Sequence, residues 1–383
     1  GYLVGGGVRD LLLGKIPKDF DIATDATPRR IKSLFSNSRI IGRRFKLVHI
    51  YFYNNKIIEV STFRDQTTLP DTEELEEIEP IKNDNTYGNE ETDAARRDIT
   101  INGLFYDIST FSIIDYVGGV KDLNDKLIRV IGDPAVRFAE DPVRLIRVVR
   151  HAVRSNFQIE EKCLNALQEN TSLILKSPKV RVYDELKKDL SSGYTLGILR
   201  KLIETGIMKY LIPGLVEGYL AKDAPLTECL ERIDEINLNQ KDFPIALVLA
   251  VIALFTKDEA STNKDFYNAF NSEEEIDNHI SKIFKSLSVT KKEKERISGV
   301  LRTWFLIMGF SEEESFKSYQ WIKHYIDDAQ LLMRVLPHTP HDRAIIKNIE
   351  HAKVELSSSR RTRSRNSGRP SSRRRNIQKS AQH

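Results

Sequence analysis

Residues 1–28 read GYLVGGGVRDLLLGKIPKDFDIATDATP, and this stretch decides the fold prediction. Its start, Tyr2–Val4, has the composition of a strand, and three glycines at 5–7 separate it from a helical pattern at 8–13. A second short strand is predicted at 20–23. A strand that meets a helix through a glycine turn and is followed by another strand is typical of an α/β domain.

Two aspartates flank Phe20 at the second strand. Side chains alternate along a strand, so Asp19 and Asp21 would share one face while Phe20 and Ile22 would point into the core. Two carboxylates this close repel each other unless a cation lies between them, and Mg²⁺ prefers oxygen ligands. Paired carboxylates of this kind hold metal ions in phosphoryl transfer. The alternative is a solvated strand with no function, because such a pair is common by chance.

The glycine turn provides a second feature of a phosphate site. Backbone N–H groups at the start of a helix can bind phosphate oxygens, and Arg9 adds a cation on the same helix. A tight turn with unusual dihedral angles would explain one or two glycines, but not the arginine and paired aspartates nearby. We therefore predict that Gly5, Gly6 and Arg9 bind phosphate close to Asp19 and Asp21.

The rest of the chain divides into segments of different character. Thr27 followed by Pro28 predicts a capped helix that ends near Phe35. The polar, acidic stretch at 64–89 is predicted to be a mobile loop, and from residue 133 onward the pattern is almost wholly helical. The other predicted elements are strands at 47–52, 57–62, 104–108 and 113–116 and a helix at 94–102.

These patterns predict an α/β head, an all-α body and a disordered basic tail. The head would occupy residues 1–130, and a helical neck that binds the nucleotide base and RNA would occupy 131–195. The helical body would extend over 196–356 and the tail over 357–383. No internal repeat is visible.

The charge of the chain is unevenly distributed. Residues 357–383 hold nine basic residues and no acid, so subtracting nine from the net charge of +4 leaves −5 for residues 1–356. A segment this rich in Ser, Arg, Gly and Pro cannot bury enough apolar surface to fold alone. It is either a solvated terminus or an arm that binds polyanions. The RNA contacts predicted in it are Arg360, Arg361, Arg373, Arg374 and Arg375.

Composition excludes several classes of protein. Cys163 and Cys229 lie far apart without CxxC spacing, so neither a disulfide framework nor a zinc site is predicted, and a reducing cytoplasm is expected. The longest apolar run, at 245–255, is too short to span a bilayer and predicts a buried helix, so no membrane partner is expected. The chain starts inside a strand-like run without a signal peptide, and we expect residues upstream of Gly1 in the natural protein.

Four segments, in order, resemble the motifs of one enzyme family. They are GGGVRDLLLGKIPKDFDIATDATP at 5–28, ARRDITIN at 95–102, DYVGG at 115–119 with Asp122 and Leu123, and EDPVRLIRVVR at 140–150. These are similar to motifs of the class II nucleotidyltransferases, which include the bacterial poly(A) polymerase I family and CCA-adding enzymes. The resemblance covers about the first 150 residues. It implies a head with a polymerase-beta-like palm built on a small mixed sheet.

The resemblance also implies roles for individual residues. Asp19 and Asp21 would be catalytic and would bind two Mg²⁺ ions, and Asp98 would complete the catalytic site through the ribose hydroxyls of the incoming nucleotide. Glu59, on a predicted strand, is a candidate third carboxylate, although alternation alone would also place an acid there. The nucleotide-binding residues implied are Gly5, Gly6, Arg9, Arg97, Asn102, Asp141, Arg144 and Arg147.

The helix that starts near residue 140 allows two interpretations. Glu140, Asp141 and Arg144 have the spacing of surface ion pairs, which stabilise a helix by a few tenths of a kcal/mol. The resemblance implies instead that Asp141 and Arg144 hydrogen-bond the edge of the nucleotide base, a task that suits the bidentate geometry of arginine. The chain departs from the family at two positions: His151 stands where the family usually has Phe, and Gly103 where it has Ala or Ser.

Two features favour poly(A) addition over CCA addition. The segment IIGRRFKLVHI at 40–50 resembles the poly(A) polymerase signature and lacks the His-Gly-Thr-like turn of CCA-adding enzymes. Its cations Arg43, Arg44 and Lys46 are predicted to contact RNA phosphates; alternatively, cations before an edge strand discourage aggregation. The basic tail suits an enzyme that accepts many different RNA 3′ ends.

The predicted function is therefore template-independent addition of AMP from ATP to RNA 3′ ends. The 3′-OH would attack the α-phosphate by a two-metal mechanism and release pyrophosphate. The first alternative is a CCA-adding tRNA nucleotidyltransferase. The second is a catalytically silent RNA-binding protein, which would have lost an acidic ligand, whereas Asp19, Asp21 and Asp98 are all present.

Overall fold

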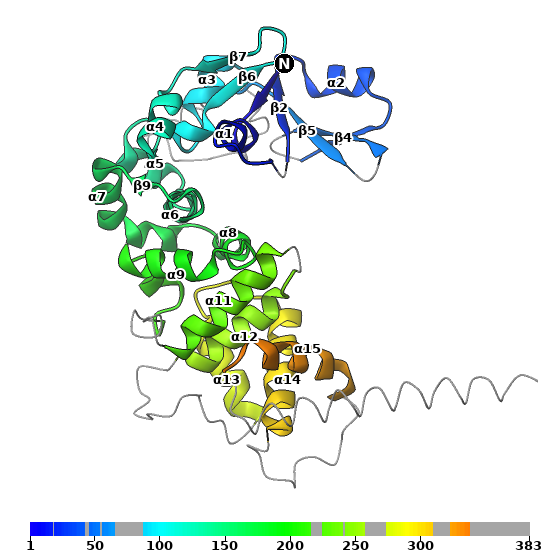
Figure 1. Ribbon diagram of the computed structural model, residues 1–383, viewed down its shortest axis with the longest axis vertical. Helices are drawn as coiled ribbons and strands as arrows, with labels where there is room; N and C mark the ends of the chain where they lie inside the picture. The colour runs from blue at the N-terminus through cyan, green and yellow to red at the C-terminus, as the bar shows by residue number, and fades with distance from the viewer. Residues whose placement is uncertain are drawn as a thin grey trace, which may run out of the picture.

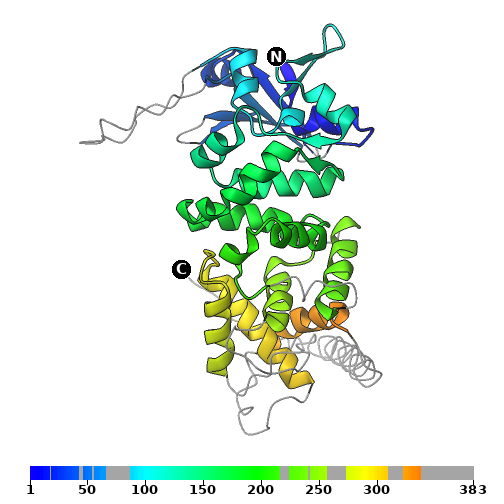
Figure 2. The same cartoon turned by 90° about the vertical axis from the view of Figure 1, so that its left-hand side faces the viewer.

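The computed structural model describes residues 1–17, 19–42, 46–53, 56–65, 87–215, 224–239, 242–256, 273–308 and 322–337. Figure 1 shows a head with a sheet at one end of the molecule and helices stacked away from it, and the turned view in Figure 2 shows the same separation. This arrangement confirms the predicted fold class of an α/β head followed by a helical body. The predicted segment boundaries remain predictions, and the tail at 357–383 lies outside the described residues.

The head is built on a mixed seven-stranded sheet with the order β3-β4-β5-β2-β1-β6-β7. Within it β2 and β5 pair in parallel, and the other described neighbours pair antiparallel. The strands are β1 (Tyr2–Val4), β2 (Asp21–Thr24), β3 (Ser38–Ile41), β4 (Leu47–Tyr51), β5 (Ile57–Thr62), β6 (Leu104–Asp107) and β7 (Ser112–Asp115). The central strands β5, β2 and β1 carry the site described below.

The prediction for Phe20 is wrong. It placed this side chain in the core of a strand at 20–23, but β2 begins at Asp21 and Phe20 is 43% exposed. The register gives the reason: β1 ends at Val4, which pairs with Asp21, so no residue of β1 is left to pair with Phe20. Asp19 therefore precedes the strand as well.

Short helices cover the head. The predicted cap is present, because the Thr27 side chain accepts a hydrogen bond from the Arg30 amide and Pro28 opens the helix. The helix predicted at 94–102 is wrong: the observed helix ends at Ala95, and Ile99 has extended dihedral angles and bridges to Val130. The helices are α1 (Gly6–Leu12), α2 (Pro28–Leu34), α3 (Glu90–Ala95), the 3₁₀ turn η2 (Thr100–Asn102) and α4 (Gly119–Asp125).

Helices dominate from residue 134 onward. A two-stranded parallel pair, β8 (Leu127–Ile128) with β9 (Gln158–Ile159), is an exception that the helical pattern did not predict. The helices are α5 (Pro134–Glu140), α6 (Arg144–Ser155), α7 (Glu161–Glu169), the 3₁₀ segment η3 (Thr171–Lys176), α8 (Lys179–Leu190), α9 (Thr195–Glu204), α10 (Met208–Leu211), α11 (Pro225–Leu238), α12 (Ile245–Phe255), α13 (Glu273–Ile283), α14 (Lys291–Ile307) and α15 (Ile322–Val335).

One buried apolar cluster runs from Leu3 and Val8 in the head through α6 to α15. Burial of this continuous surface is the main favourable term that fixes α6 against α8 and α9. The buried Arg150 of α6 adds ion pairs to Glu185, at 2.6 Å, and to Asp189, both on α8.

The predicted buried helix at 245–255 is confirmed as α12, whose residues 246–255 are all buried. Among the helices that the structure describes, none is long and apolar enough to cross a membrane. Cys163 and Cys229 are both buried free thiols. The reducing cytoplasm expected for them remains a prediction.

Candidate active site

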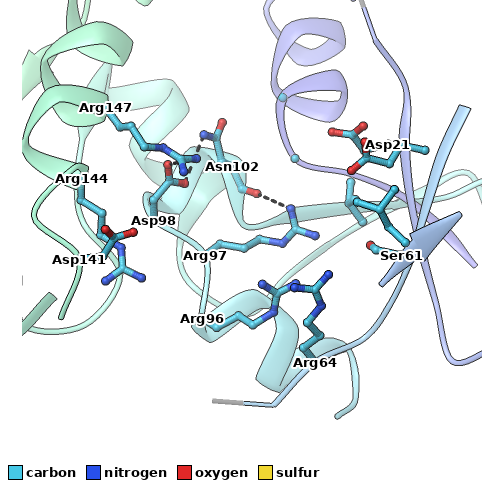
Figure 3. Close-up of a pocket in the computed structure, with 15 residues that line it drawn as sticks. Asp21, Ser61, Arg64, Arg96, Arg97, Asp98, Asn102, Asp141, Arg144 and Arg147 are labelled. Carbon is cyan, nitrogen blue, oxygen red and sulfur yellow. Dashed lines mark hydrogen bonds and ion pairs between the residues drawn. The ribbon is translucent and has the colours of Figure 1, made fainter. Parts of the chain in front are cut away.

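A cavity of about 530 Å³ lies between the head sheet and the segment that joins α5 to α6. Figure 3 shows side chains from both parts converging on it. One wall, the carboxylate wall, holds Asp21 and Glu59. The rest of the lining, the arginine wall, holds five guanidinium groups: Arg64, Arg96, Arg97, Arg144 and Arg147.

The carboxylate wall depends on the parallel pairing of β2 and β5. Asp21, the first residue of β2, lies directly opposite Glu59 on β5. Glu59 also approaches His49 of the neighbouring strand, with Oε2 and Nε2 3.4 Å apart. Asp19 is exposed just before β2 and does not line the cavity. The sequence left Glu59 open as a third carboxylate, and the strand register places it beside Asp21.

Negative charge is crowded at this wall. Although solvent reaches Asp21, desolvation in the cavity raises its pKa, the charges of Glu59 and Asp19 raise it further, and Arg97 partly opposes them. A cation bound here would relieve that repulsion, and carboxylate oxygens are the ligands that Mg²⁺ prefers. The donor set therefore fits a divalent cation. Within the described part of the chain, no group of three or more His, Cys, Asp or Glu side chains forms a ready-made metal cluster.

The glycine turn brings α1 to the edge of the cavity. Gly5 has φ 71°, a left-handed conformation that favours glycine, and a Cβ there would lie 3.1 Å from Nη1 of Arg97. A Cβ on Gly7 would lie 3.3 Å from the carbonyl oxygen of Asp19. Glycine at these positions lets an arginine and the Asp19 segment approach the turn closely. Gly5 and Gly6 both line the cavity.

Arg9 lies behind the cavity and does not line it. It is 8% exposed. Its Nη1 donates a hydrogen bond to Oδ1 of Asn102, at 2.7 Å, and its Nε and Nη2 donate to Oδ1 of Asp10. The prediction placed Arg9 against a phosphate, whereas in this structure its contacts support Asn102, which does line the cavity.

Arg96 and Arg97 are held by Asp93, a residue that the sequence analysis did not single out. Nε of Arg96 donates to Oδ1 of Asp93 at 2.8 Å, and Nη2 of Arg97 donates to Oδ2 at 2.9 Å. Burial raises the pKa of Asp93, but Arg97 and Arg96 outweigh it and hold this pKa below its usual range. The signal was available, because Asp93 stands three and four residues before the two arginines at the end of a helix.

Asp98 and Arg147 form an ion pair at the cavity wall. Nη2 of Arg147 lies 2.7 Å from Oδ2 of Asp98, as the dashed line in Figure 3 marks. Burial raises the pKa of Asp98, but Arg147 and further hydrogen bonds lower it to about 2. Nδ2 of Asn102 lies 3.5 Å from Oδ1 of the same carboxylate. The structure thus brings these three predicted residues together.

Both interpretations of the segment around Arg144 find a counterpart in the structure. Nη1 of Arg144 forms the predicted surface pair with Oε2 of Glu140, at 3.1 Å, and also donates to the carbonyl of Arg137. Asp141 pairs with Arg181 of α8, at 3.1 Å. Asp141 and Arg144 nevertheless both line the cavity and lie next to each other in Figure 3. Arg181, which lies 40 residues along the chain from Asp141, was not predicted from the sequence.

The predicted RNA-binding residues are only partly described. Lys46 is exposed immediately before Leu47, which lines the cavity. Arg43 and Arg44 lie outside the described residues, as do the five tail arginines Arg360, Arg361, Arg373, Arg374 and Arg375.

Solved structures share this fold. The crystal structure of the Bacillus stearothermophilus CCA-adding enzyme in complex with CTP aligns with a TM-score of 0.63 and 22% identity, over 93% of this chain and 78% of that chain. A tRNA nucleotidyltransferase complexed with a primer tRNA and an incoming ATP analog aligns with a TM-score of 0.62 and 24% identity, over 93% of this chain and 96% of that chain. At these identities the likeness establishes the fold.

Sequence comparisons establish the family. A model of the poly A polymerase head domain matches residues 1–129, and a model described as "Probable RNA and SrmB- binding site of polymerase A" matches residues 156–218. Poly(A) polymerase I of Escherichia coli O157:H7 is 41% identical over 237 residues, which cover 61% of this chain. The chain spans about half the length of that relative, 51%.

Two other relatives match different shares of the chain. The CCA-adding enzyme of Bacillus pumilus is 36% identical over 219 residues, covering 57% of this chain and 52% of that enzyme. Poly(A) polymerase I of Salmonella typhi is 33% identical over 339 residues, covering 84% of this chain and 71% of the relative. The chain belongs to the bacterial poly(A) polymerase family of nucleotidyltransferases.

Proposed function

We propose that the chain is a polynucleotide adenylyltransferase that adds AMP from ATP to RNA 3′ ends without a template. The observation that carries the proposal is the composition of one cavity, in which paired carboxylates face five arginines across a space large enough for a nucleotide. A nucleoside triphosphate needs cationic groups along its phosphates and a carboxylate-bound metal at the reacting phosphorus. The relationship to poly(A) polymerase I supports the same activity.

The carboxylate wall would hold the metal. Asp21 and Glu59 supply oxygen ligands, and the charge of Asp19 just before β2 adds to the negative charge already crowded there. Two Mg²⁺ ions bound there would supply charge stabilisation and a lowered pKa for the attacking hydroxyl. The parallel pairing of β2 with β5 holds the Asp21 and Glu59 carboxylates side by side.

The arginine wall would bind the triphosphate. Arg97, Arg96 and Arg64 line the cavity, and Arg97 lies beside the glycine turn, where the amide of Gly6 adds an N–H donor. As the RNA 3′-OH forms a bond to the α-phosphorus, the bond to the bridging oxygen of the β-phosphate breaks and pyrophosphate leaves. Fixed guanidinium groups stabilise the charge that develops on this leaving group.

The neck side of the cavity would bind the nucleoside. Asp98 is buried and ionised, so with Asn102 it can hydrogen-bond the ribose hydroxyls, while Arg147 holds its carboxylate in place. Asp141 and Arg144 are close enough to each other to contact one base edge. Oδ1 of Asp141 is buried without a hydrogen-bond partner and is available as an acceptor for the exocyclic amine of adenine.

CCA addition is the second candidate. A CCA-adding enzyme is 36% identical over more than half of the chain, and the solved structures with the same fold include CCA-adding enzymes. Arg43 and Arg44, in the segment at 40–50 that is expected to separate the two activities, lie outside the described residues. The substrate therefore has to be identified by assay.

The experiment supplies purified protein with Mg²⁺, radiolabelled ATP or CTP, and either an oligo(A) primer or tRNA that lacks its CCA end. We expect long ATP-dependent products on oligo(A). Addition of two C and one A to the truncated tRNA would favour the second candidate instead. Absence of any product, with a folded protein, would contradict both and support a silent RNA-binding scaffold.

A further inference from the structure

His151 lies on α6 behind the cavity, and none of the roles proposed above uses it. Each ring nitrogen faces an N–H donor from a different element of the head. Nδ1 lies 3.3 Å from Nη1 of Arg9 on α1, and Nε2 lies 3.4 Å from Nδ2 of Asn102 on η2. The ring of this α6 residue therefore lies between the glycine-turn helix and the cavity wall.

The donors that face His151 are buried. Arg9 and Asn102 are each 8% exposed, so their N–H groups need partners inside the protein. Arg9 already donates through Nε and Nη2 to Asp10, at 2.9 and 2.8 Å, and through Nη1 to Oδ1 of Asn102 at 2.7 Å. The second N–H of Nη1 is free to donate a hydrogen bond to His151.

The ring acts as an acceptor only while it is neutral. A neutral imidazole has one acceptor nitrogen and one N–H group, so one tautomer accepts from Arg9 and the other from Asn102. Burial lowers the pKa of His151; Asp98 opposes this effect, and three arginines reinforce it, so that the pKa falls to about 3. These three cations are Arg9 on α1 and Arg147 and Arg150 on α6.

His151 directly contacts Asn102, a residue of the proposed nucleoside site. Asn102 lines the cavity, and its Nδ2 lies 3.5 Å from Oδ1 of Asp98. The Asn102 amide is thus set by three neighbours: Arg9 at its oxygen, and His151 and Asp98 at its nitrogen. A phenylalanine at position 151, the residue expected from the family resemblance, would fill the same space but accept no hydrogen bond from either donor.

We propose that His151 is a positioning residue of the nucleotide site: its ring accepts a hydrogen bond from Arg9 or Asn102 and holds the Asn102 amide against Asp98. The inference rests on the proposed function, because it assumes that Asn102 and Asp98 bind a nucleoside. A residue with this role affects how tightly the nucleotide is held rather than the chemical step. The effect should therefore appear in KM and in ATP affinity, with little change in kcat.

The test compares three proteins with the wild type. His151→Phe keeps a ring without acceptors, His151→Gln restores an acceptor oxygen, and His279→Phe is the matched control. The control removes a histidine whose Nε2 lies 2.9 Å from the Ala253 carbonyl in the helical body, far from the cavity. ATP affinity is measured by calorimetry without RNA, KM and kcat by primer extension, and folding by thermal unfolding.

We expect His151→Phe to weaken ATP binding and raise KM by about fivefold, the ratio that corresponds to one lost hydrogen bond, with kcat unchanged. His151→Gln should recover most of this affinity, and His279→Phe should lower thermal stability without changing ATP affinity. If His151→Phe fails to fold, His151→Leu, which is smaller and also lacks an acceptor, replaces it in the comparison.

Two results would overturn the proposal. One is an acceptor-free variant that binds ATP as tightly as the wild type. The other is a loss of affinity that His151→Gln shares in full or that His279→Phe reproduces, because the effect would then come from stability alone. A wild type that binds no nucleotide is a different failure: it would overturn the proposed function first, and this inference with it.

Discussion

The two walls of the cavity are built on opposite electrostatic principles. On the carboxylate wall, Asp21 and Glu59 lie side by side with Asp19 nearby, and desolvation and this crowding both raise the pKa of Asp21. On the arginine wall, each cation whose contacts are described above has an acidic partner. These pairs are Arg96 and Arg97 with Asp93, Arg144 with Glu140, and Arg147 with Asp98.

This difference indicates what each wall needs from a ligand. The carboxylate wall is unfavourable by itself and is relieved by a cation, so its residues should matter for activity and little for folding. The arginine wall is held in place by its own ion pairs before any substrate binds. Changes there should therefore reduce stability as well as nucleotide binding.

The largest expected effect is on the carboxylate wall. Asp21→Asn should lower the rate of AMP addition by about a thousandfold or more, because it removes a metal ligand at the reacting phosphorus. Stability should hold or rise, because repulsion with Glu59 and Asp19 disappears. Asp25→Asn, an exposed aspartate just after β2, is the control and should keep full activity. Activity of Asp21→Asn within tenfold of the wild type would contradict the assignment of Asp21 as a metal ligand.

Asp98→Asn tests the arginine wall. The pKa of Asp98 is about 2, below its ordinary 3.8, so the folded state favours the ionised form. The resulting stability is fully present above about pH 4 and is lost as the pH falls towards 2. At pH 7 the variant should lose on the order of 2 kcal/mol of unfolding free energy. Denaturant titrations should show that the difference in unfolding free energy between the wild type and the variant becomes smaller near about pH 3. A difference that stays constant with pH would contradict the ion pair.

Arg144→Ala separates base recognition from the surface ion pair. If Arg144 contacts the base edge, its loss should reduce the ATP-to-CTP ratio of kcat/KM by a factor that corresponds to about 1–3 kcal/mol. If its contact with Glu140 is its only role, the ratio should stay constant and stability should fall by less than about 1 kcal/mol. Single-nucleotide incorporation with each triphosphate distinguishes the two results.

Deletion of residues 357–383 is expected to have the smallest effect on activity. This segment carries nine cations, and if a third of them contact RNA, the slope of log K against log salt should fall in magnitude by about two. ATP affinity and turnover at saturating RNA should not change, because neither wall is altered. Binding isotherms for oligo(A) at several salt concentrations provide the measurement. Superimposable salt plots for the two forms would assign the tail to a solvated terminus.

Local patterns in the sequence predicted the carboxylate wall better than the arginine wall. The spacing of Asp19 and Asp21, the glycine turn and the strand at 57–62 are local signals, and the predicted bounds of β5 (Ile57–Thr62) were correct to the residue. The strand β3 was missed, because Ser38–Ile41 is short and packs on the edge of the sheet. The partner of Asp21 on that wall, Glu59, became clear only from the register of the parallel strands.

Some contacts that support the arginine wall and its neighbours join residues far apart in the sequence. Arg9 bonds Asn102, which is 93 residues away, and Arg181 bonds Asp141 across 40 residues. No periodic pattern encodes such pairs, so the sequence could place these residues near the site but could not say whether they face the ligand or support its neighbours. The motif resemblance identified Asp98 and Arg147, and their direct ion pair was visible only in the folded chain.

The central claim is that the carboxylate wall is built for a divalent cation. The most direct measurement is the shift in thermal unfolding midpoint on adding Mg²⁺, without nucleotide, for the wild type and for Asp21→Asn. Binding to the folded state raises the midpoint, so we expect a clear rise of about a few degrees for the wild type and less than half of it for the variant. Equal shifts in the two proteins, or no shift in the wild type at saturating Mg²⁺, would contradict the claim.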